Sequence, residues 1–386
     1  MYFHVMDGSI IEYRTPGQLI AALLEERGWS QRVLAVILAV DETTISKILN
    51  NERPVTADMA LSLDEIFEVP ADRFLALQRQ YDLAQARIVA MPDPGRATRA
   101  KLFGGLPVTE MIRRGWLDAN DVRDVKKVES ELARFFGVAS VQEIEILPHA
   151  AKKTNVSAET TPTQLAWLYR VRQIASEMIV ARYSPTRMSN ALAQLQKLTI
   201  AAEEVRKVPR ILAEHGVRFV IVEALPSSKI DGVCFWLDAS SPVIAMSIRY
   251  DRIDNFWFVL RHEIEHVLQQ HGKSKIVIDT ELEGERAGSG PGVDEEERQA
   301  NSAAAEFCVP KRSMDSFIAR KAPLFAERDL LGLAATLKVH PGLVAGQLHH
   351  RTGQFKNFRG HLVKVRSLIA PSALVDGWGD VVSTDS

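Results

Sequence analysis

The chain has 386 residues, of which 46% are hydrophobic and 25% are charged, and its formal net charge at pH 7 is −2. This length favours two or three domains, and the composition excludes a wholly disordered chain. Residues 1–90 carry an excess of acidic groups, so binding of nucleic acid by this part gains nothing from bulk charge.

The sequence also disfavours a membrane location and disulfide bonds. Residues 1–17 lack the basic and then apolar segments of a secretion signal, and no later apolar run approaches the roughly 18 residues that a membrane span needs. The two cysteines, Cys234 and Cys308, cannot build a disulfide framework and are expected to be buried free thiols. We therefore expect a cytoplasmic protein with no membrane partner.

Residues 15–51 predict three consecutive short helices. The first ends at Gly28, the second is capped by Ser30 and the third is capped by Asp41. The expected apolar positions of the second and third helices are Val33, Leu34, Ile37, Leu38, Ile45, Ile48 and Leu49. Two short helices joined by a tight turn form a helix-turn-helix, whose second helix enters the major groove of DNA.

Polar side chains on these two helices are candidate DNA contacts. Hydroxyl groups reach phosphates or base edges, and lysine contacts phosphate or guanine. The candidates are Gln31, Thr43, Thr44, Ser46 and Lys47. The alternative is a small helical bundle whose polar face is merely solvated, and the acidic balance of residues 1–90 favours that alternative.

Three quoted runs carry a family resemblance. PGQLIAALLEERGWSQ, TTISKILNNERPVTADMALSLDEIF and FLALQRQYDLAQAR together resemble the Xre-type domain of HigA-like antitoxins, across nearly all of residues 14–87. The resemblance implies a homodimer that binds operator DNA, represses its own operon and holds a toxin in check. Ala39 stands where the family usually has a turn glycine, and Asp41 where a serine is common. Neither change forbids the turn, because aspartate caps a helix as well as serine does.

A linker and helical segments follow. Residues 91–100, MPDPGRATRA, contain two prolines and a glycine and predict a linker after a first domain at residues 1–90. Helical periodicity predicts a connector at residues 91–200, whose basic surplus we interpret as a solvated face.

The next segment has β character. Runs at residues 218–226, 232–237 and 242–248 are rich in β-branched and aromatic residues and predict a small sheet. A helix is expected directly after them, with Asp251 or Asp254 as its N-cap.

That helix contains the stretch RHEIEHVLQQHG, residues 261–272, with a His-Glu-x-x-His pattern. On a helix, His262 and His266 lie one turn apart on one face, so their imidazoles can converge on one metal ion. Glu263 stands where a carboxylate would take the proton of a water molecule polarised by the metal. The alternative is an amphipathic helix that carries histidines and binds no metal.

A third ligand is expected from residues 294–310. Alanines and a phenylalanine there form a small-residue stripe that permits close approach of another helix, at positions Ala300, Ala303, Ala304 and Phe307. Glu297 lies one turn before this stripe and on the same face, whereas Glu295 and Glu296 are rotated away from it. The expected metal ligands are therefore His262, His266 and Glu297. Zinc suits two imidazoles and a carboxylate, and manganese and iron stay open.

The runs WFVLRHEIEHVLQQHGK, ERQANSAAAEFCVP and LAATLKVHPGLVAGQLHHRTGQFKNF closely resemble the ImmA/IrrE-like metallopeptidase domain, over roughly residues 205–360. In that family the two histidines bind zinc, the glutamate between them is the catalytic base and a glutamate before an Ala-Asn pair completes the ligands. By position these are His262, His266, Glu263 and Glu297.

The sequence leaves more than one role for some of the other polar residues near the motif. Glu265 replaces the glycine that the family often has before the second histidine, and we expect a surface residue or one that crowds the substrate cleft. His271 is a possible transition-state donor, but a capping or surface role is favoured. His349 and His350 receive no metal role.

These patterns predict a mainly α protein with a small β-sheet (α+β). It has a helix-turn-helix domain at residues 1–90, a helical connector at 91–200 and a zincin-like metallopeptidase domain with a C-terminal extension at 201–386. Its predicted function is a transcription regulator that carries a zinc-dependent peptidase-like domain and acts in a stress response or a toxin–antitoxin operon. Its expected partners are operator DNA and either a cognate toxin or a repressor protein as substrate. The rival is a non-catalytic antitoxin that sequesters a toxin, with the metal domain as scaffold or sensor. Self-cleavage near residues 88–100 is a third possibility, because that linker is expected to be exposed.

Overall fold

The structure is a computed structural model, and it describes residues 5–6, 9–10, 13–90, 96–144, 160–273, 276–280 and 295–384. Contacts divide the chain into two compact units, Met1–Pro94 and Gly95–Ser386. The protein is mainly helical, and its largest sheet within the described residues has five strands. The predicted α+β class is confirmed.

The first unit is a helical bundle with its own apolar core, drawn from residues 19–74. Its elements are β1 (Val5–Met6), β2 (Ser9–Ile10), α1 (Pro16–Arg27), α2 (Gln31–Ile37), α3 (Glu42–Leu49), α4 (Ala57–Phe67) and α5 (Ala71–Val89). Thr15 caps α1, and Gly28 ends it in the left-handed conformation. Helices α1 and α3 approach closely, because a Cβ atom on Gly17 would lie 2.3 Å from the backbone oxygen of Leu49. The three predicted helices at residues 15–51 are thus confirmed.

The second unit is built around the five-stranded sheet, whose strand order is β6-β4-β5-β3-β7. The strands are β3 (Arg218–Val222), β4 (Ile230–Trp236), β5 (Pro242–Met246), β6 (Val277–Thr280) and β7 (Leu374–Asp376). The sheet is mixed: β3 runs parallel to β5 and β7, whereas β4 is antiparallel to β5 and β6. The three predicted β-rich runs became β3, β4 and β5, and the short strands β6 and β7 were not foreseen.

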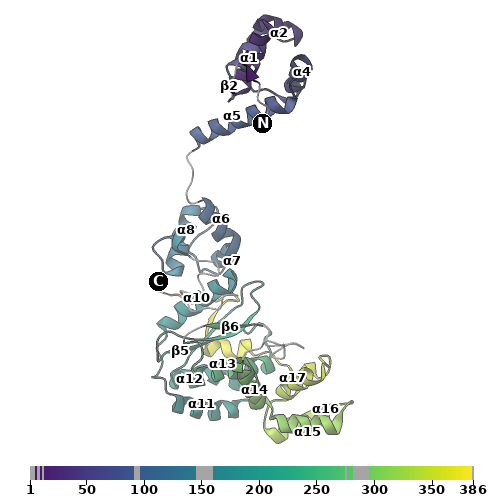
Figure 1. Cartoon of the computed structure of the whole chain (residues 1–386). Helices are drawn as coiled ribbons and strands as arrows, with labels where there is room; N and C mark the ends of the chain where they lie inside the picture. Colours follow the sequence, from purple (N-terminus) through teal and green to yellow (C-terminus); the bar gives the residue numbers. More distant parts are fainter. Residues whose placement is uncertain are drawn as a thin grey trace. The chain divides into compact units, whose positions relative to one another are not determined.

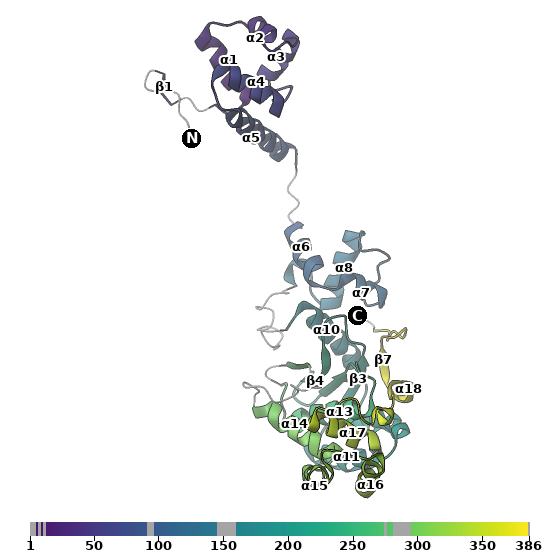
Figure 2. The same ribbon diagram turned by 90° about the vertical axis from the view of Figure 1, so that its right-hand side faces the viewer.

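Two groups of helices pack against opposite faces of this sheet. The first group is α6 (Arg96–Gly105), α7 (Val108–Arg113), α8 (Val125–Phe136), η1 (Val141–Glu143) and α10 (Pro162–Glu177). The second group is α11 (Pro185–Leu198), η2 (Ala202–Lys207), α12 (Val208–Glu214), α13 (Ile253–Leu268), α14 (Glu295–Cys308), α15 (Lys311–Lys321), α16 (Glu327–Leu337), α17 (Pro341–Thr352), η3 (Arg359–His361), α18 (Arg366–Ile369) and η4 (Ala370–Ser372). Figures 1 and 2 show α10 on one side of the sheet and α13, α14 and α17 on the other.

Successive side chains along a strand point to opposite faces of the sheet, so each strand contributes to two apolar cores. In β3, Phe219 and Ile221 join the core that contains α13, while Val220 and Val222 join the core that contains α8 and α10. Every one of these four side chains is buried. Of the helices in the predicted connector, α6 to α10 therefore cover one face of the sheet, whereas α11 packs in the core on the other face.

A buried polar contact joins β7 to those helices. The carboxylate of Asp376 accepts hydrogen bonds from Arg170 at 2.6 and 3.0 Å and from the indole N–H of Trp116 at 2.6 Å. Arg170 lies on α10 and Trp116 follows α7. The side chain of Arg170 is 4% exposed and that of Asp376 is 0% exposed, so the ion pair is screened from water.

Several local predictions are wrong. On α2 the buried residues are Leu34 and Ala35, whereas Val33 and Ile37 are 41% and 46% exposed. Asp41 stands at the N-cap of α3 but makes no capping hydrogen bond with its side chain. The neighbouring turn holds Ala39 at a φ of 53°, which costs alanine about 1–2 kcal/mol relative to right-handed backbone.

Two element boundaries also need correction. The N-cap of α13 is Arg252, because Asp254 already lies in its first turn and Asp251 instead accepts backbone hydrogen bonds from residues 365 and 366. The predicted linker is wrong for residues 96–100, which belong to α6, and residues 91–95 lie outside the described residues. Within the described residues, no helix has the length and apolar character needed to cross a bilayer.

Candidate metal centre and helix-turn-helix

Helix α13 positions the paired histidines. Its apolar face is held in the core by side chains that include Phe256, Trp257 and Val259, which fixes its rotation about its axis. His262, Glu263 and His266 are all buried, at 0%, 0% and 6% exposure. The Nε2 atoms of the two histidines lie 3.0 Å apart, which is the convergence expected for ligands one helical turn apart.

Helix α14 packs against α13 and brings Glu297 to the histidines. Ala300 and Ala304 are buried, which allows the two helices to come close. One carboxylate oxygen of Glu297 lies 3.4 Å from His262 Nε2, and the other lies 3.5 Å from His266 Nε2. The structure thus brings together the three residues that the sequence singled out as metal ligands.

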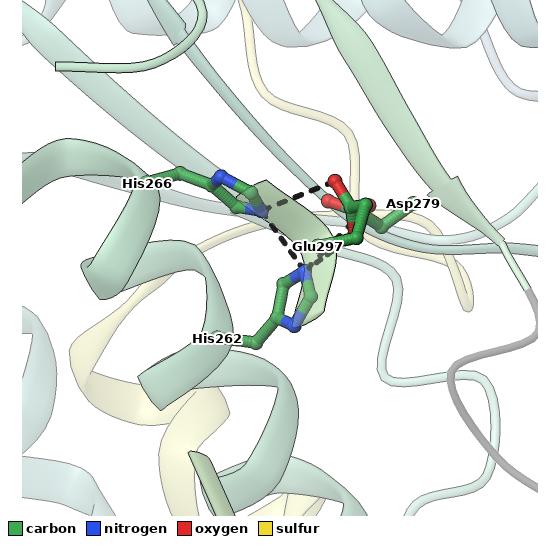
Figure 3. Close-up of side chains that lie close together, drawn as sticks. All are labelled: His262, His266, Asp279 and Glu297. Carbon is green, nitrogen blue, oxygen red and sulfur yellow. Dashed lines mark hydrogen bonds and ion pairs between the residues drawn. The ribbon is translucent and has the colours of Figure 1, made fainter. Parts of the chain in front are cut away.

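A further carboxylate, that of Asp279 on β6, lies in the same cluster and was missed from the sequence. Its Oδ1 atom lies 3.6 Å from His262 Nε2. One donor atom from each of His262, His266, Asp279 and Glu297 lies within 4.8 Å of all the others. Figure 3 shows these four side chains pointing toward one another, two from the helix and one from each neighbouring segment. The donor set of two imidazoles and two carboxylates fits zinc.

Each histidine has a partner for its other ring nitrogen. His262 Nδ1 lies 3.1 Å from the side-chain oxygen of Asn301, which can only accept, so this nitrogen carries the proton and leaves Nε2 free for a metal. His266 Nδ1 lies 3.0 Å from His271 Nδ1. The backbone N–H of His271 also donates to the carbonyl of His266 at 2.8 Å and so caps the end of α13, as favoured from sequence. Its partly exposed ring contacts His266 and lies 3.7 Å from Glu296, a contact that the sequence did not indicate.

The electrostatics of the cluster call for a cation. Burial alone would lower the pKa of His262, but the carboxylates of Asp279 and Glu297 outweigh this effect and raise that pKa to about 9. Burial lowers the pKa of His266 to about 4. A buried carboxylate, Asp279, and a half-buried one, Glu297, face the same imidazole nitrogen, and a divalent cation would supply the positive charge between them.

Glu263 lies next to the cluster, and neither of its carboxylate oxygens makes a hydrogen bond to the residues that the structure describes. Burial, together with the negative charge of Asp279, raises the pKa of Glu263 well above its ordinary value. Room for its side chain comes from Gly232 on β4, where a Cβ atom would lie 2.2 Å from Glu263 Oε1. A larger residue at position 232 would therefore displace Glu263.

The other polar residues near the motif lie outside the cluster. Glu265 is ion-paired with Arg261 at 2.7 Å and accepts a hydrogen bond from Gln269 at 2.9 Å. His349 is buried against the backbone oxygen of Asn357, and His350 is exposed. Cys234 and Cys308 are buried free thiols, as predicted.

In the first unit, α2 and α3 form the helix-turn-helix. Gln31, Thr43 and Lys47 are exposed, and Thr44 and Ser46 are partly exposed, so all five candidate contacts lie at the surface. The hydroxyl of Thr44 accepts a hydrogen bond from Arg53 at 3.2 Å. Arg53 adds a cation beside α3 that the sequence did not single out, because it lies beyond the end of that helix.

These features define a protein class in which a helix-turn-helix DNA-binding domain is followed by a metallopeptidase-like α+β domain. Comparison with family models makes this specific. A helix-turn-helix model matches residues 20–74, and an IrrE N-terminal-like domain model matches residues 213–349. The chain therefore carries a helix-turn-helix domain near its N-terminus and an IrrE-like domain in its second unit.

Individual relatives match the N-terminal part. The uncharacterized HTH-type transcriptional regulator YbaQ of Escherichia coli K12 is 36% identical over 70 residues, which is 18% of this chain and 62% of that protein. YbaQ of Escherichia coli O6:H1 matches with the same values, so the chain spans less than two thirds of the curated relatives it matches. A solved addiction module antidote protein of a HigA family from Coxiella burnetii is 29% identical, covers 20% of this chain and 95% of that chain, and has a TM-score of 0.17.

Proposed function

We propose that the protein is a cytoplasmic, homodimeric transcription regulator that binds operator DNA and carries a zinc-dependent peptidase domain, acting in a stress response or a toxin–antitoxin operon. The observation that carries the enzymatic half is the convergence of His262, His266 and Glu297 beside a buried glutamate, Glu263. The IrrE-like family match over residues 213–349 supports it.

The chain's own residues account for the proton transfers. A zinc ion held by His262, His266 and Glu297 would polarise a peptide carbonyl and lower the pKa of a water molecule. In this proposal Glu263 would take the proton from that water as it attacks the carbonyl carbon, and would then pass the proton to the leaving amine.

Glu263→Gln is expected to lower peptide cleavage by about 10²–10⁴-fold while metal content stays at the wild-type level, because the amide keeps the shape but cannot accept the proton. Cleavage is measured with a quenched-fluorescent peptide library and with the proteins of neighbouring genes. Glu265→Gln is the matched control, since Glu265 lies on the same helix outside the cluster. Equal cleavage by wild type and Glu263→Gln would assign the activity to another site.

DNA binding is proposed to use α3, with Gln31 and Lys47 reaching the duplex from the two helices of the motif. Lys47→Ala should weaken binding to operator and unrelated DNA by a similar factor, and should lower the slope of log affinity against log salt by about one. The measurement is fluorescence anisotropy at several salt concentrations with DNA from upstream of the gene. Arg79→Ala, which removes an exposed cation on α5, is the control. An unchanged salt slope for Lys47→Ala would contradict the contact.

The second candidate is a non-catalytic antitoxin whose metal domain acts as scaffold or sensor. It is favoured by the presence of a fourth potential protein ligand, Asp279, because closed metal sites are usually structural. A small toxin encoded beside this gene should then co-purify with the protein. Binding of that toxin to Glu263→Gln with unchanged affinity, together with no cleavage by wild type, would select this candidate over the peptidase.

A further inference from the structure

The position of Asp279 distinguishes it from a residue that merely supports a ligand. Supporting groups bind the ring nitrogen that points away from a metal, and Asn301 already occupies that position on His262. Asp279 instead approaches Nε2, the nitrogen that faces His266 and Glu297. Its carboxylate therefore lies on the side of the imidazole where a metal ion would bind.

The donor atoms of His262, His266 and Glu297 have the spacing of ligands around one ion, and the carboxylate of Asp279 lies within 4.8 Å of all three. Two donors that each lie about 2.0–2.1 Å from a tetrahedral ion are about 3.3 Å apart. The corresponding distances are 3.0 Å between the histidines, 3.4 and 3.5 Å from the histidines to Glu297, and 3.6 Å from His262 to Asp279. Asp279 is 5% exposed, so bulk water does not compete for its oxygens.

An irregularity in the sheet places Asp279 there. β6 is an edge strand beside β4, and the register of the pair shifts between Ile230 and Gly232, so that Asp279 lies opposite Gly232. Gly232 is also the residue whose missing side chain makes room for Glu263. The neighbouring Ile278 packs in the core on the opposite face of the sheet. Because neighbouring side chains of a strand point to opposite faces of the sheet, Asp279 points toward α13.

We infer that Asp279 is a fourth protein ligand, which closes the coordination sphere of the metal in the resting protein. This inference rests on the proposed metal centre. A hydrolytic zinc site has three protein ligands and one open position, whereas a site with four is closed. Peptide cleavage therefore requires Asp279 to withdraw. Its strand is four residues long and is the edge strand among the described residues, where a bound peptide can pair with its outer side.

The test uses the full-length protein loaded with cobalt, whose visible absorption reports coordination number and the entry of small anions. Azide should leave the spectrum of the wild type unchanged, because no position is open, and should shift the spectra of Asp279→Ala and Asp279→Asn. Zinc affinity, measured by competition with a chromogenic chelator, should fall by about tenfold or more in both variants. Asp238→Ala, an exposed aspartate in the turn after β4, is the matched control.

The possible failures can be told apart. If wild type binds cobalt and azide shifts its spectrum as it shifts that of the variants, the fourth-ligand assignment is wrong while the metal centre stands. If folded wild type takes up neither cobalt nor zinc, the metal centre itself is wrong, and the inference fails with it. The wild-type azide measurement decides the assignment even if Asp279→Ala misfolds, and Asp279→Asn preserves the shape of the side chain.

Discussion

Glu297→Ala is expected to reduce the metal content of the purified protein from about one zinc per chain to nearly none after dialysis against a weak chelator. Glu297 is the one cluster residue that faces both histidines, with its two oxygens 3.4 and 3.5 Å from their Nε2 atoms. Its loss removes a ligand and also leaves the two imidazoles without a shared carboxylate. Metal content is measured by mass spectrometry of the acid-digested protein.

The control for this prediction lies on the same helix. Glu295→Ala removes an exposed carboxylate that pairs with Arg298, outside the cluster, and should keep the wild-type metal content. Retention of one zinc by Glu297→Ala would show that the metal is bound elsewhere. Absence of metal from well-folded wild type would leave the DNA-binding antitoxin as the better description of the protein.

Asp376→Ala is expected to destabilise the second unit by about 3–5 kcal/mol, because it leaves the guanidinium of Arg170 buried without its counter-ion. The indole N–H of Trp116 loses its acceptor as well. Unfolding in urea is followed by tryptophan fluorescence, since five of the six tryptophans lie in residues 95–386. The midpoint should move to markedly lower urea concentration.

Asp380→Ala is the matched control, because this aspartate is exposed and lies four residues after Asp376. It should change the free energy of unfolding by no more than about 0.5 kcal/mol. Similar midpoints for the two variants would mean that the buried ion pair contributes little to the free energy of unfolding. A loss confined to Asp376→Ala would show that β7 is anchored to α10 through this contact.

The two histidines and Glu297 could be predicted from the sequence, because the position of each depends only on the periodicity of the helix that carries it. The spacing of His262 and His266 and the position of Glu297 on an alanine stripe follow from 3.6 residues per turn, and the structure brings all three together. The helix-turn-helix was accessible for the same reason, although the buried face of α2 was not. That face depends on which of several apolar residues meets α1 and α3, and Ala35 is buried there while Val36 is 75% exposed.

The sequence by itself determined the fold class, the paired histidines with their glutamate, the third carboxylate and the helices that carry the proposed DNA contacts. Only the tertiary structure decided that Asp279 joins the cluster, that Asn301 and His271 support the histidines, and that Asp376 anchors a strand to Arg170. Strands of three and four residues have too little periodicity to be recognised, and the register shift beside Gly232 depends on pairing between separate segments. Contacts between residues so far apart in the chain exist only once the sheet has formed.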